Sequence, residues 1–402
     1  MPDKPLLSFV SFKKDSFIIL EGKQNADRFY IIKQGQVFLS KEVELVEEDN
    51  LLKEGDFFGV VSSMSGHSHI ETARALTDIV LISVARGEYT QLIQSNAPIA
   101  MKIIRQFSKR MRYLDEALTA RIMKYDIQTP ATQIYDVAEY YIRQAQYNIA
   151  FYAYHQYIKN NPSGPNTASA REKMLKLAPR TKNVKLEQNF ADFNRVYAKD
   201  TMIFSEGESG HELYIIQKGA VKIVKIVQNQ EMLLAVLHAG DIFGEMALLE
   251  SKPRAACAIA YEDTTLIAVN QQNFEGMAIS QPQLVARLTT LLSDRIWFSY
   301  KQLANACIAD PLGRIYDQLL IQLEKDHVPL GNNSSYVFDF GPKELINMLG
   351  ISKQDGMDLI RKIMAGGRII VVENRIHVTD LSEIVKYAEF YHKREKIRQF
   401  HA

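Results

Sequence analysis

The chain has few of the residues that mark a disulfide-stapled, metal-binding or membrane-embedded protein. Its 402 residues include only two cysteines, Cys257 and Cys307, and one tryptophan. Two cysteines at this separation form neither a disulfide framework nor a metal-ligand motif, so we expect free thiols in a reduced compartment. The apolar run from Leu6 to Phe12 is too short for a membrane span or a secretory leader. These absences predict a soluble, cytoplasmic protein with no metal and no membrane partner.

Neither sign of charge dominates. The chain holds 48 Lys and Arg against 47 Asp and Glu, a formal net charge of +1. Such a balance creates no global field toward nucleic acid or anionic lipid. The length favours two to four domains. The sequence contains no Walker loop, HExxH or GxSxG motif, and its nine histidines are scattered, so we expect a protein without enzymatic activity.

The most informative stretch runs from Gly240 to Ala258 and joins a glycine loop to a nearby arginine. Gly244 has no Cβ, so a ligand can approach its backbone closely, and the residues after it can start a helical turn with unpaired N–H groups. Those N–H groups suit an anion, and the guanidinium of Arg254 matches phosphate oxygens. Glu245 would repel a phosphate unless it binds something else, such as a sugar hydroxyl. The residues therefore predict a ligand with a phosphate and a ribose.

The pattern Phe-Gly-Glu-x-Ala-Leu-Leu-x-x-x-Pro-Arg-Ala-Ala resembles the phosphate-binding cassette of cyclic nucleotide-binding domains. The resemblance implies that Glu245 binds the ribose 2′-hydroxyl and Arg254 the cyclic phosphate. A small apolar residue after the arginine accompanies cAMP in this family, whereas a hydroxyl residue accompanies cGMP, so Ala255 favours cAMP. The implied nucleotide-binding set is Gly244, Glu245, Met246, Ala247, Leu248, Arg254, Ala255 and Ala256.

Residues 1 to about 120 repeat the pattern of residues 186 to about 306 at an offset of 184 to 185. In each copy short β-branched and aromatic runs alternate with turn residues, which predicts an antiparallel barrel or roll. Helical patterns follow at residues 93–122 and 273–306. The first copy has Val60 in place of Glu245 and His69 in place of Arg254. Because a charge-assisted hydrogen bond contributes roughly 1.5–3 kcal/mol, we expect a degenerate, mainly structural copy. The alternatives are that protonated His69 binds a phosphate or that this copy binds a different ligand.

Residues 124–180 form a separate segment. Residues 134–159 have helical spacing rich in Tyr and Ala, Asn161 to Pro165 break the pattern, and a second helix is expected over residues 167–177. The segment resembles a single tetratricopeptide-type hairpin. It is predicted to be either a helical spacer packed on the barrels or a helix pair that binds a protein partner.

The amphipathic helix from Leu288 to Ala306 precedes a run starting at Asp310 that resembles the hinge of bacterial Crp/Fnr-type regulators. In that family the long helix forms the seam of a homodimer. The resemblance implies that Ser299 contacts the base and that Tyr300 does so from the partner subunit. The alternative is that both are ordinary residues of a dimer helix.

The C-terminal stretch resembles a winged helix-turn-helix, with the first helix and the turn over residues 341–352 and the second helix over residues 353–365. A wing over residues 366–378 and a last helix over residues 381–398 would follow. The reading helix is atypical, because Asp355 and Asp358 face the expected DNA and Gly356 weakens the helix by about 1 kcal/mol. Residues 310–402 hold 13 basic and 13 acidic side chains. The sequence therefore leaves two alternatives for the target of this domain, double-stranded DNA and a protein surface. The candidate DNA-binding residues are Lys353, Gln354, Arg361, Lys362 and Arg368.

Together these features predict an α+β chain. It would contain two cyclic nucleotide-binding β-rolls (jelly-roll-like) with lid helices, a TPR-like helical spacer and a C-terminal winged helix-turn-helix. The expected domains are residues 1–123, 124–183, 184–308 and 309–402. The predicted function is a cAMP-sensing transcription regulator, and the alternative is a nucleotide-responsive protein-interaction or kinase-regulatory scaffold that does not bind DNA.

Overall fold

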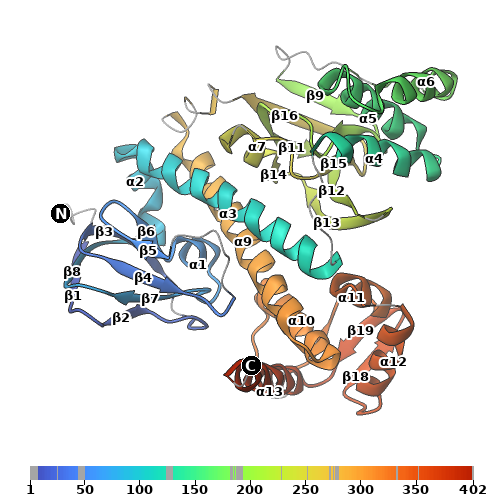
Figure 1. The fold of residues 1–402 in the computed structure, drawn as a ribbon. Helices are drawn as coiled ribbons and strands as arrows, with labels where there is room; N and C mark the ends of the chain where they lie inside the picture. The colour runs from blue at the N-terminus through green and yellow to red at the C-terminus, as the bar shows by residue number, and fades with distance from the viewer. Residues whose placement is uncertain are drawn as a thin grey trace. The chain divides into compact units, whose positions relative to one another are not determined.

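The computed structural model describes residues 8–24, 26–43, 50–123, 130–181, 184, 186, 193–227, 229–250, 252–270, 273–274, 276, 280–331, 334–351 and 353–400 (Figure 1). The chain divides into two compact units. One comprises residues 1–86, 113–125 and 293–402, and the other comprises residues 87–112 and 126–292. No helix among the described residues is long and apolar enough to cross a membrane.

The first repeat consists of two four-stranded antiparallel sheets, with strand orders β1-β8-β3-β6 and β2-β7-β4-β5. Alternate side chains of the strands point into the space between the sheets, where Ile32 and Leu81 of one sheet meet Val37 and Ala73 of the other. The strands are β1 (Ser8–Phe12), β2 (Phe17–Ile19), β3 (Arg28–Gln34), β4 (Val37–Ser40), β5 (Leu51–Leu52), β6 (Phe57–Phe58), β7 (Thr72–Ala75) and β8 (Ile79–Ala85).

The second repeat has the same two sheets in the same order, β14-β11-β16-β9 and β10-β15-β12-β13. Its core centres on Tyr214, Phe243 and Leu266. The predicted duplication is therefore present in the strand topology as well as in the sequence. The strands are β9 (Asn194–Tyr197), β10 (Met202–Phe204), β11 (Glu212–Lys218), β12 (Ala220–Val227), β13 (Gln230–His238), β14 (Ile242–Phe243), β15 (Cys257–Ala260) and β16 (Thr264–Asn270).

A long helix follows each repeat. In the first, the predicted helix over residues 93–122 is divided into α2 (Tyr89–Ser95) and α3 (Ala97–Met123). Asn96 interrupts it with φ −151°, and its side-chain oxygen accepts a hydrogen bond from the N–H of Ile99. In the second repeat α9 spans Pro282–Cys307.

The middle segment forms three helices, α4 (Pro130–Arg143), α5 (Tyr147–Asn160) and α6 (Thr167–Leu177). The expected helical stretch over residues 134–159 is interrupted, because Ala145 adopts a left-handed φ of 57° and forms a turn between α4 and α5. The buried tyrosines of these helices share a core with Cys257 and Ile259 of the second repeat. The segment thus covers one sheet of that repeat.

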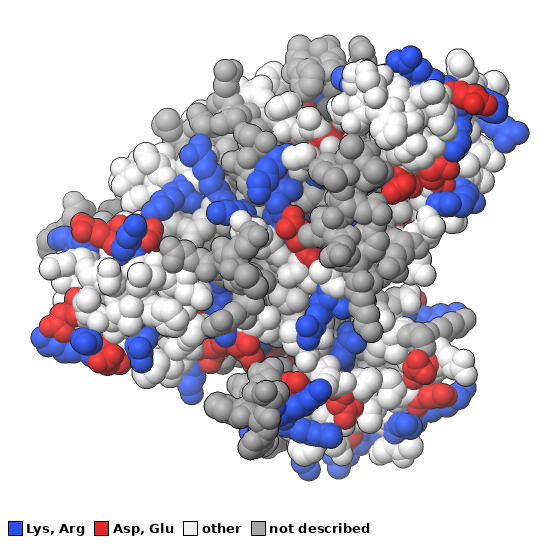
Figure 2. Space-filling view, in the orientation of Figure 1, with Lys and Arg blue, Asp and Glu red and all other residues white. Residues whose placement is uncertain are grey.

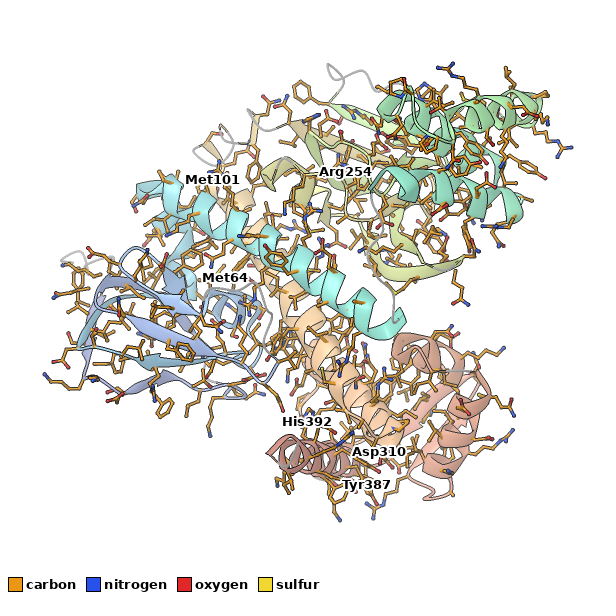
Figure 3. All side chains as sticks on the ribbon, viewed as in Figure 1. Met64, Met101, Arg254, Asp310, Tyr387 and His392 are labelled. Carbon is orange, nitrogen blue, oxygen red and sulfur yellow. The ribbon has the colours of Figure 1, made fainter. Side chains whose placement is uncertain are left out.

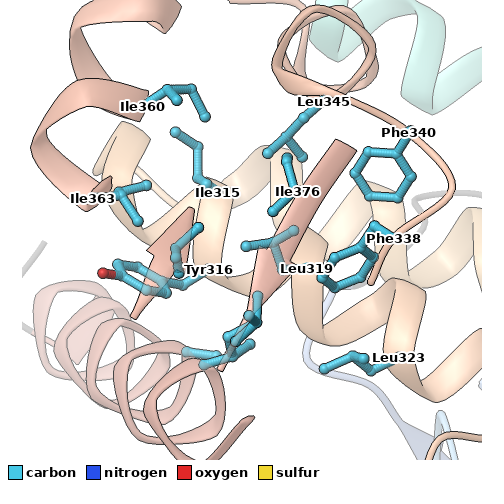
Figure 4. Packing of buried hydrophobic residues seen from close by; sticks show 14 of the residues in the cluster. Ile315, Tyr316, Leu319, Leu323, Phe338, Phe340, Leu345, Ile360, Ile363 and Ile376 are labelled. Atoms are coloured by element: carbon cyan, nitrogen blue, oxygen red, sulfur yellow. The ribbon is translucent and has the colours of Figure 1, made fainter. Parts of the chain in front are cut away.

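The C-terminal elements enclose a separate core around Leu319, Phe338 and Ile376 (Figure 4). Helix α10 begins where the Asp310 carboxylate accepts a hydrogen bond from the N–H of Leu312. The three short strands form a sheet of order β17-β19-β18. The elements are α10 (Pro311–Lys325), β17 (Tyr336–Val337), α11 (Pro342–Leu349), α12 (Lys353–Met364), β18 (Ile369–Val372), β19 (Arg375–Val378) and α13 (Leu381–Phe400).

Candidate functional site

Arg254 is the buried cation at the centre of the candidate site in the second repeat (Figure 3). Only 5% of the residue is exposed. One terminal nitrogen, Nη1, donates to the carbonyl oxygen of Gly244 at 2.7 Å, and the guanidinium carbon lies 4.2 Å from the ring centre of Phe204. The buried Nε has no hydrogen-bond partner among the described residues. A buried guanidinium with an unused donor is an environment that favours an anion.

Two glycines make room for this guanidinium. A Cβ at Gly210 would lie 2.4 Å from Arg254 Nε and 2.5 Å from its Cζ. A Cβ at Gly244 would lie 2.7 Å from Arg254 Nη1, and Gly244 also adopts a left-handed φ of 79°. Side chains at these positions would displace the guanidinium, so the glycines determine where Arg254 can lie.

The cassette begins where β14 ends. Gly244 leads into the short helix α7 (Glu245–Glu250), in which Glu245 is 1% exposed. Ala247 and Ala256 are buried, and Met246 and Ala255 are half-buried. The side chain of Leu248 lies outside the described residues. Of these residues, Gly244 contacts Arg254 through its carbonyl oxygen, and a Cβ at Gly210 would lie within 2.7 Å of both the Arg254 guanidinium and the Cβ of Ala247.

A second acidic residue, Glu208, supports the turn that carries Arg254. The N–H of Arg254 donates to the carbonyl oxygen of Glu208 at 2.8 Å. Burial raises the pKa of the Glu208 carboxyl to about 7, and the N–H of Ser205 and the Arg254 guanidinium oppose that rise. The Tyr152 hydroxyl of α5 lies 3.1 Å from both carboxylate oxygens of Glu208. The middle segment is therefore hydrogen-bonded to the loop beside the candidate site.

The first repeat has the corresponding backbone hydrogen bond and, in addition, a carboxylate of its own. The N–H of His69 donates to the carbonyl oxygen of Lys23 at 2.9 Å, in the position of the Arg254 to Glu208 bond. Here the N–H of Gly59 donates to Oε1 of Glu71 at 2.9 Å. Glu71 is 4% exposed and occupies the place that Ala256 has in the second repeat. The Glu71 carboxylate therefore accepts a hydrogen bond from the backbone N–H of Gly59, the glycine that opens this cassette.

Ser299 and Tyr300, the expected base contacts, belong to the unit that contains the first repeat, whereas Arg254 belongs to the other unit. The Tyr300 hydroxyl donates to Glu21 Oε1 at 2.9 Å and accepts from the N–H of Val43 at 3.2 Å. Ser299 is buried, with 7% exposed. The Tyr300 hydroxyl is therefore hydrogen-bonded within the first repeat, and its expected contact with a base from a partner subunit stays a prediction.

The candidate DNA-binding residues lie on α12 and at the start of the adjoining hairpin. Arg361 pairs with Asp358 at 2.8 Å, and Arg368 pairs with Asp380 and Glu383, each at 3.3 Å. Gln354 and Lys362 are exposed, and the side chain of Lys353 lies outside the described residues. Basic and acidic side chains are interspersed over the C-terminal elements on the face shown in Figure 2.

Sequence reasoning did not single out Gly210, Glu71, Glu208 or Tyr152. The repeat alignment contains a signal for Glu71, because an acidic residue replaces an alanine in the cassette of the first copy. No comparable signal marks Tyr152, since its contact with Glu208 joins segments that are far apart in the chain.

Parts of this chain are similar to known proteins. The sequence model of one protein family, the cyclic nucleotide-binding domain, matches residues 9–96 and 194–281. The Cyclic AMP receptor protein of Thermus thermophilus is 26% identical over 195 residues, 48% of this chain and 87% of that protein. The CRP-like cAMP-activated global transcriptional regulator of Mycobacterium tuberculosis is 24% identical over 187 residues, 46% of this chain and 84% of that protein. A solved structure of a CooA mutant from Carboxydothermus hydrogenoformans is 20% identical with a TM-score of 0.41, and the match covers 48% of this chain and 87% of that one. The two stretches that the family model matches lie one in each repeat.

Proposed function

We propose that this protein is a cAMP-sensing regulator and that its second repeat is the sensor. The observation that carries the proposal is the buried Arg254 guanidinium between Gly210 and Gly244, with its Nε lacking a partner among the described residues. A cyclic phosphate would satisfy that donor and neutralise the buried charge. The names of the relatives in Thermus thermophilus and Mycobacterium tuberculosis, both of which refer to cAMP, support the choice of ligand.

The other cassette residues complete this proposal. Glu245 would accept a hydrogen bond from the ribose 2′-hydroxyl, and the backbone N–H groups of residues 244–248 would bind the phosphate oxygens. Ala255 and Ala256 offer no hydroxyl to a base, which favours cAMP over cGMP. Nothing in this arrangement requires a catalytic step, so we propose a binding protein and not an enzyme.

The first repeat is proposed to be a scaffold that binds no nucleotide. Its cassette lacks the guanidinium and the ribose carboxylate, and Glu71 already accepts from Gly59. An incoming phosphate would lie close to the buried Glu71 carboxylate and would find His69 where the second repeat has Arg254, so like charges would repel without a guanidinium to offset them. Protonated His69 as a phosphate ligand is the weaker candidate for the same reason.

Calorimetric titration with cAMP and cGMP tests the sensor, with Arg254→Ala and the equivalent change His69→Ala compared at equal protein concentration. We expect Arg254→Ala to weaken cAMP binding at least tenfold, because a charge-assisted pair is lost, and His69→Ala to leave it unchanged. Unchanged binding in Arg254→Ala, or loss of binding in His69→Ala, would remove the second repeat from this role.

The C-terminal elements are proposed to be the output, a winged helix that binds double-stranded DNA when the sensor is occupied. Binding at Arg254 would shift α9, the long helix that leads to the C-terminal elements, and re-aim those elements. The free energy of this shift can be no larger than the difference in the ligand's binding free energy between the two states. The exposed pair of Arg361 with Asp358 is worth about 0–1 kcal/mol, so a DNA phosphate can displace that carboxylate.

A second output, contact with a protein, is favoured by the carboxylates that already pair with Arg361 and Arg368. Fluorescence anisotropy with duplex DNA over a salt series distinguishes the two outputs, because phosphate contacts give a steep salt dependence. DNA binding that strengthens with cAMP and weakens in Arg361→Ala would support the DNA output. The absence of binding at low salt with cAMP present would support the protein output. A homodimer and a protein partner at the middle segment remain predictions.

A further inference from the structure

The long helices of the two repeats start at equivalent positions. Helix α3 begins at Ala97 and α9 at Pro282, 185 residues apart, which is also the spacing between Gly59 and Gly244. Strands β8 and β16, which precede the helices, show the same spacing. A residue of α3 can therefore be compared directly with its counterpart on α9.

Arg112 of α3 contacts the cassette of the second repeat. Its Nη1 donates to the carbonyl oxygen of Pro253 at 3.1 Å, and only 7% of the residue is exposed. Pro253 is the residue immediately before Arg254. Both ends of this bond lie in one compact unit, although the helix follows the first repeat in the chain and the cassette belongs to the second.

Trp297 of α9 makes the matching contact. Its indole N–H donates to the carbonyl oxygen of Ser68 at 3.2 Å, and the side chain is fully buried. Ser68 immediately precedes His69, and both ends of this bond lie in the other unit. Trp297 corresponds to Arg112 and Ser68 to Pro253, since each pair is 185 positions apart. Two separate contacts thus join equivalent positions of the two repeats, each from a side-chain N–H of a long helix to a backbone carbonyl oxygen.

We propose that the repeats exchange segments of their long helices within one chain, residues 97–112 of α3 for residues 293–307 of α9, so that Arg112 positions Arg254 in the nucleotide site of the second repeat. The effect on nucleotide binding rests on the proposed function; the exchange itself does not. The guanidinium of Arg112 holds the carbonyl before Arg254 and thereby restrains the turn that presents the phosphate ligand. In this arrangement one chain contributes the long helices of both repeats, whereas the homodimer expected from the sequence would take the second long helix from the partner subunit.

The exchange is tested without nucleotide by cross-linking. In a Cys257→Ala/Cys307→Ala background, the pair Arg112→Cys/Pro253→Cys is treated with a short bifunctional thiol reagent, and the products are identified by mass spectrometry. We expect a linked peptide pair in a product of monomer mass. A covalent dimer, or two labelled but unlinked thiols, would overturn the exchange.

The role of Arg112 is tested by titrating cAMP and adenosine, which lacks the phosphate. We expect Arg112→Ala to weaken cAMP binding at least tenfold without affecting adenosine, and Arg112→Lys to restore part of the loss. Trp297→Phe, which removes the matching donor from the first repeat, should leave cAMP binding unchanged. Binding by Arg112→Ala within twofold of the original, or an equal loss for both ligands, would refute a positioning role. If the original chain binds no cAMP while the cross-link forms, the sensor proposal fails and the exchange stands.

Discussion

The backbone N–H of Gly59 donates to Oε1 of Glu71 at 2.9 Å, in a cassette whose counterpart has Gly244 and Ala256 at the same positions. Two copies of one fold thus use the same glycine differently. In the first copy the anion belongs to the chain, and in the second we propose that it arrives with the ligand.

Replacing Glu71 should destabilise the first repeat. Glu71→Ala removes the acceptor of a buried, charge-assisted hydrogen bond, which contributes roughly 1.5–3 kcal/mol. Glu71→Gln keeps a carbonyl acceptor and should cost less. Urea denaturation of both variants measures the difference, and equal stability of Glu71→Ala and the original chain would contradict the account.

Replacing Gly210 should weaken cAMP binding without unfolding the second repeat. In Gly210→Ala the new Cβ would meet the Arg254 guanidinium at about 2.4–2.5 Å, so the side chain must move out of its place. We expect at least a tenfold rise in the dissociation constant for cAMP. Gly87→Ala, where a Cβ meets nothing within 4 Å, is the matched control. Unchanged binding by Gly210→Ala would show that the observed position of Arg254 is irrelevant to the ligand.

The stability of the second repeat should depend on pH through Glu208. Its folded pKa of about 7 lies above the ordinary value of 4.5. Between these values the folded state binds more protons than the unfolded state, so this group lowers stability as pH rises from 4.5 to 7. Glu208→Gln should therefore unfold at higher urea than the original chain at pH 8, with little difference at pH 4.5. Glu262→Gln, at an exposed position, serves as the control, and the same pH profile in Glu208→Gln and the original chain would argue against this assignment.

Gly356 should resist replacement although it lies inside a helix. Helix propensity alone predicts that Gly356→Ala stabilises α12 by about 1 kcal/mol. In the structure its Cβ would meet side-chain atoms of Ile346 on α11 at 2.6–2.8 Å. We expect a net loss of about 1–3 kcal/mol from overpacking, and partial rescue by Ile346→Val. Thermal unfolding of both variants, beside the more open Gly366→Ala, checks the sign, and a stabilised Gly356→Ala would contradict it.

The sequence pattern was sufficient to predict the elements whose structure depends on residues that are neighbours in the chain. The helix expected over residues 167–177 is α6 (Thr167–Leu177), and the predicted reading helix begins at Lys353, as α12 does. The turn at Ala145 was missed because no Gly or Pro marks it, and the contact of Tyr300 with Glu21 was not foreseen because it spans most of the chain. Glu71 shows the same limit: the substitution is visible in the sequence, but its bond to Gly59 depends on the folded loop.

The most direct test of the central claim is the stoichiometry of cAMP binding, measured by calorimetry on the intact chain. The account predicts one cAMP per chain, bound through Arg254. Two bound nucleotides would contradict the assignment of the first repeat as a scaffold. No binding at any concentration tested would contradict the second repeat as the sensor.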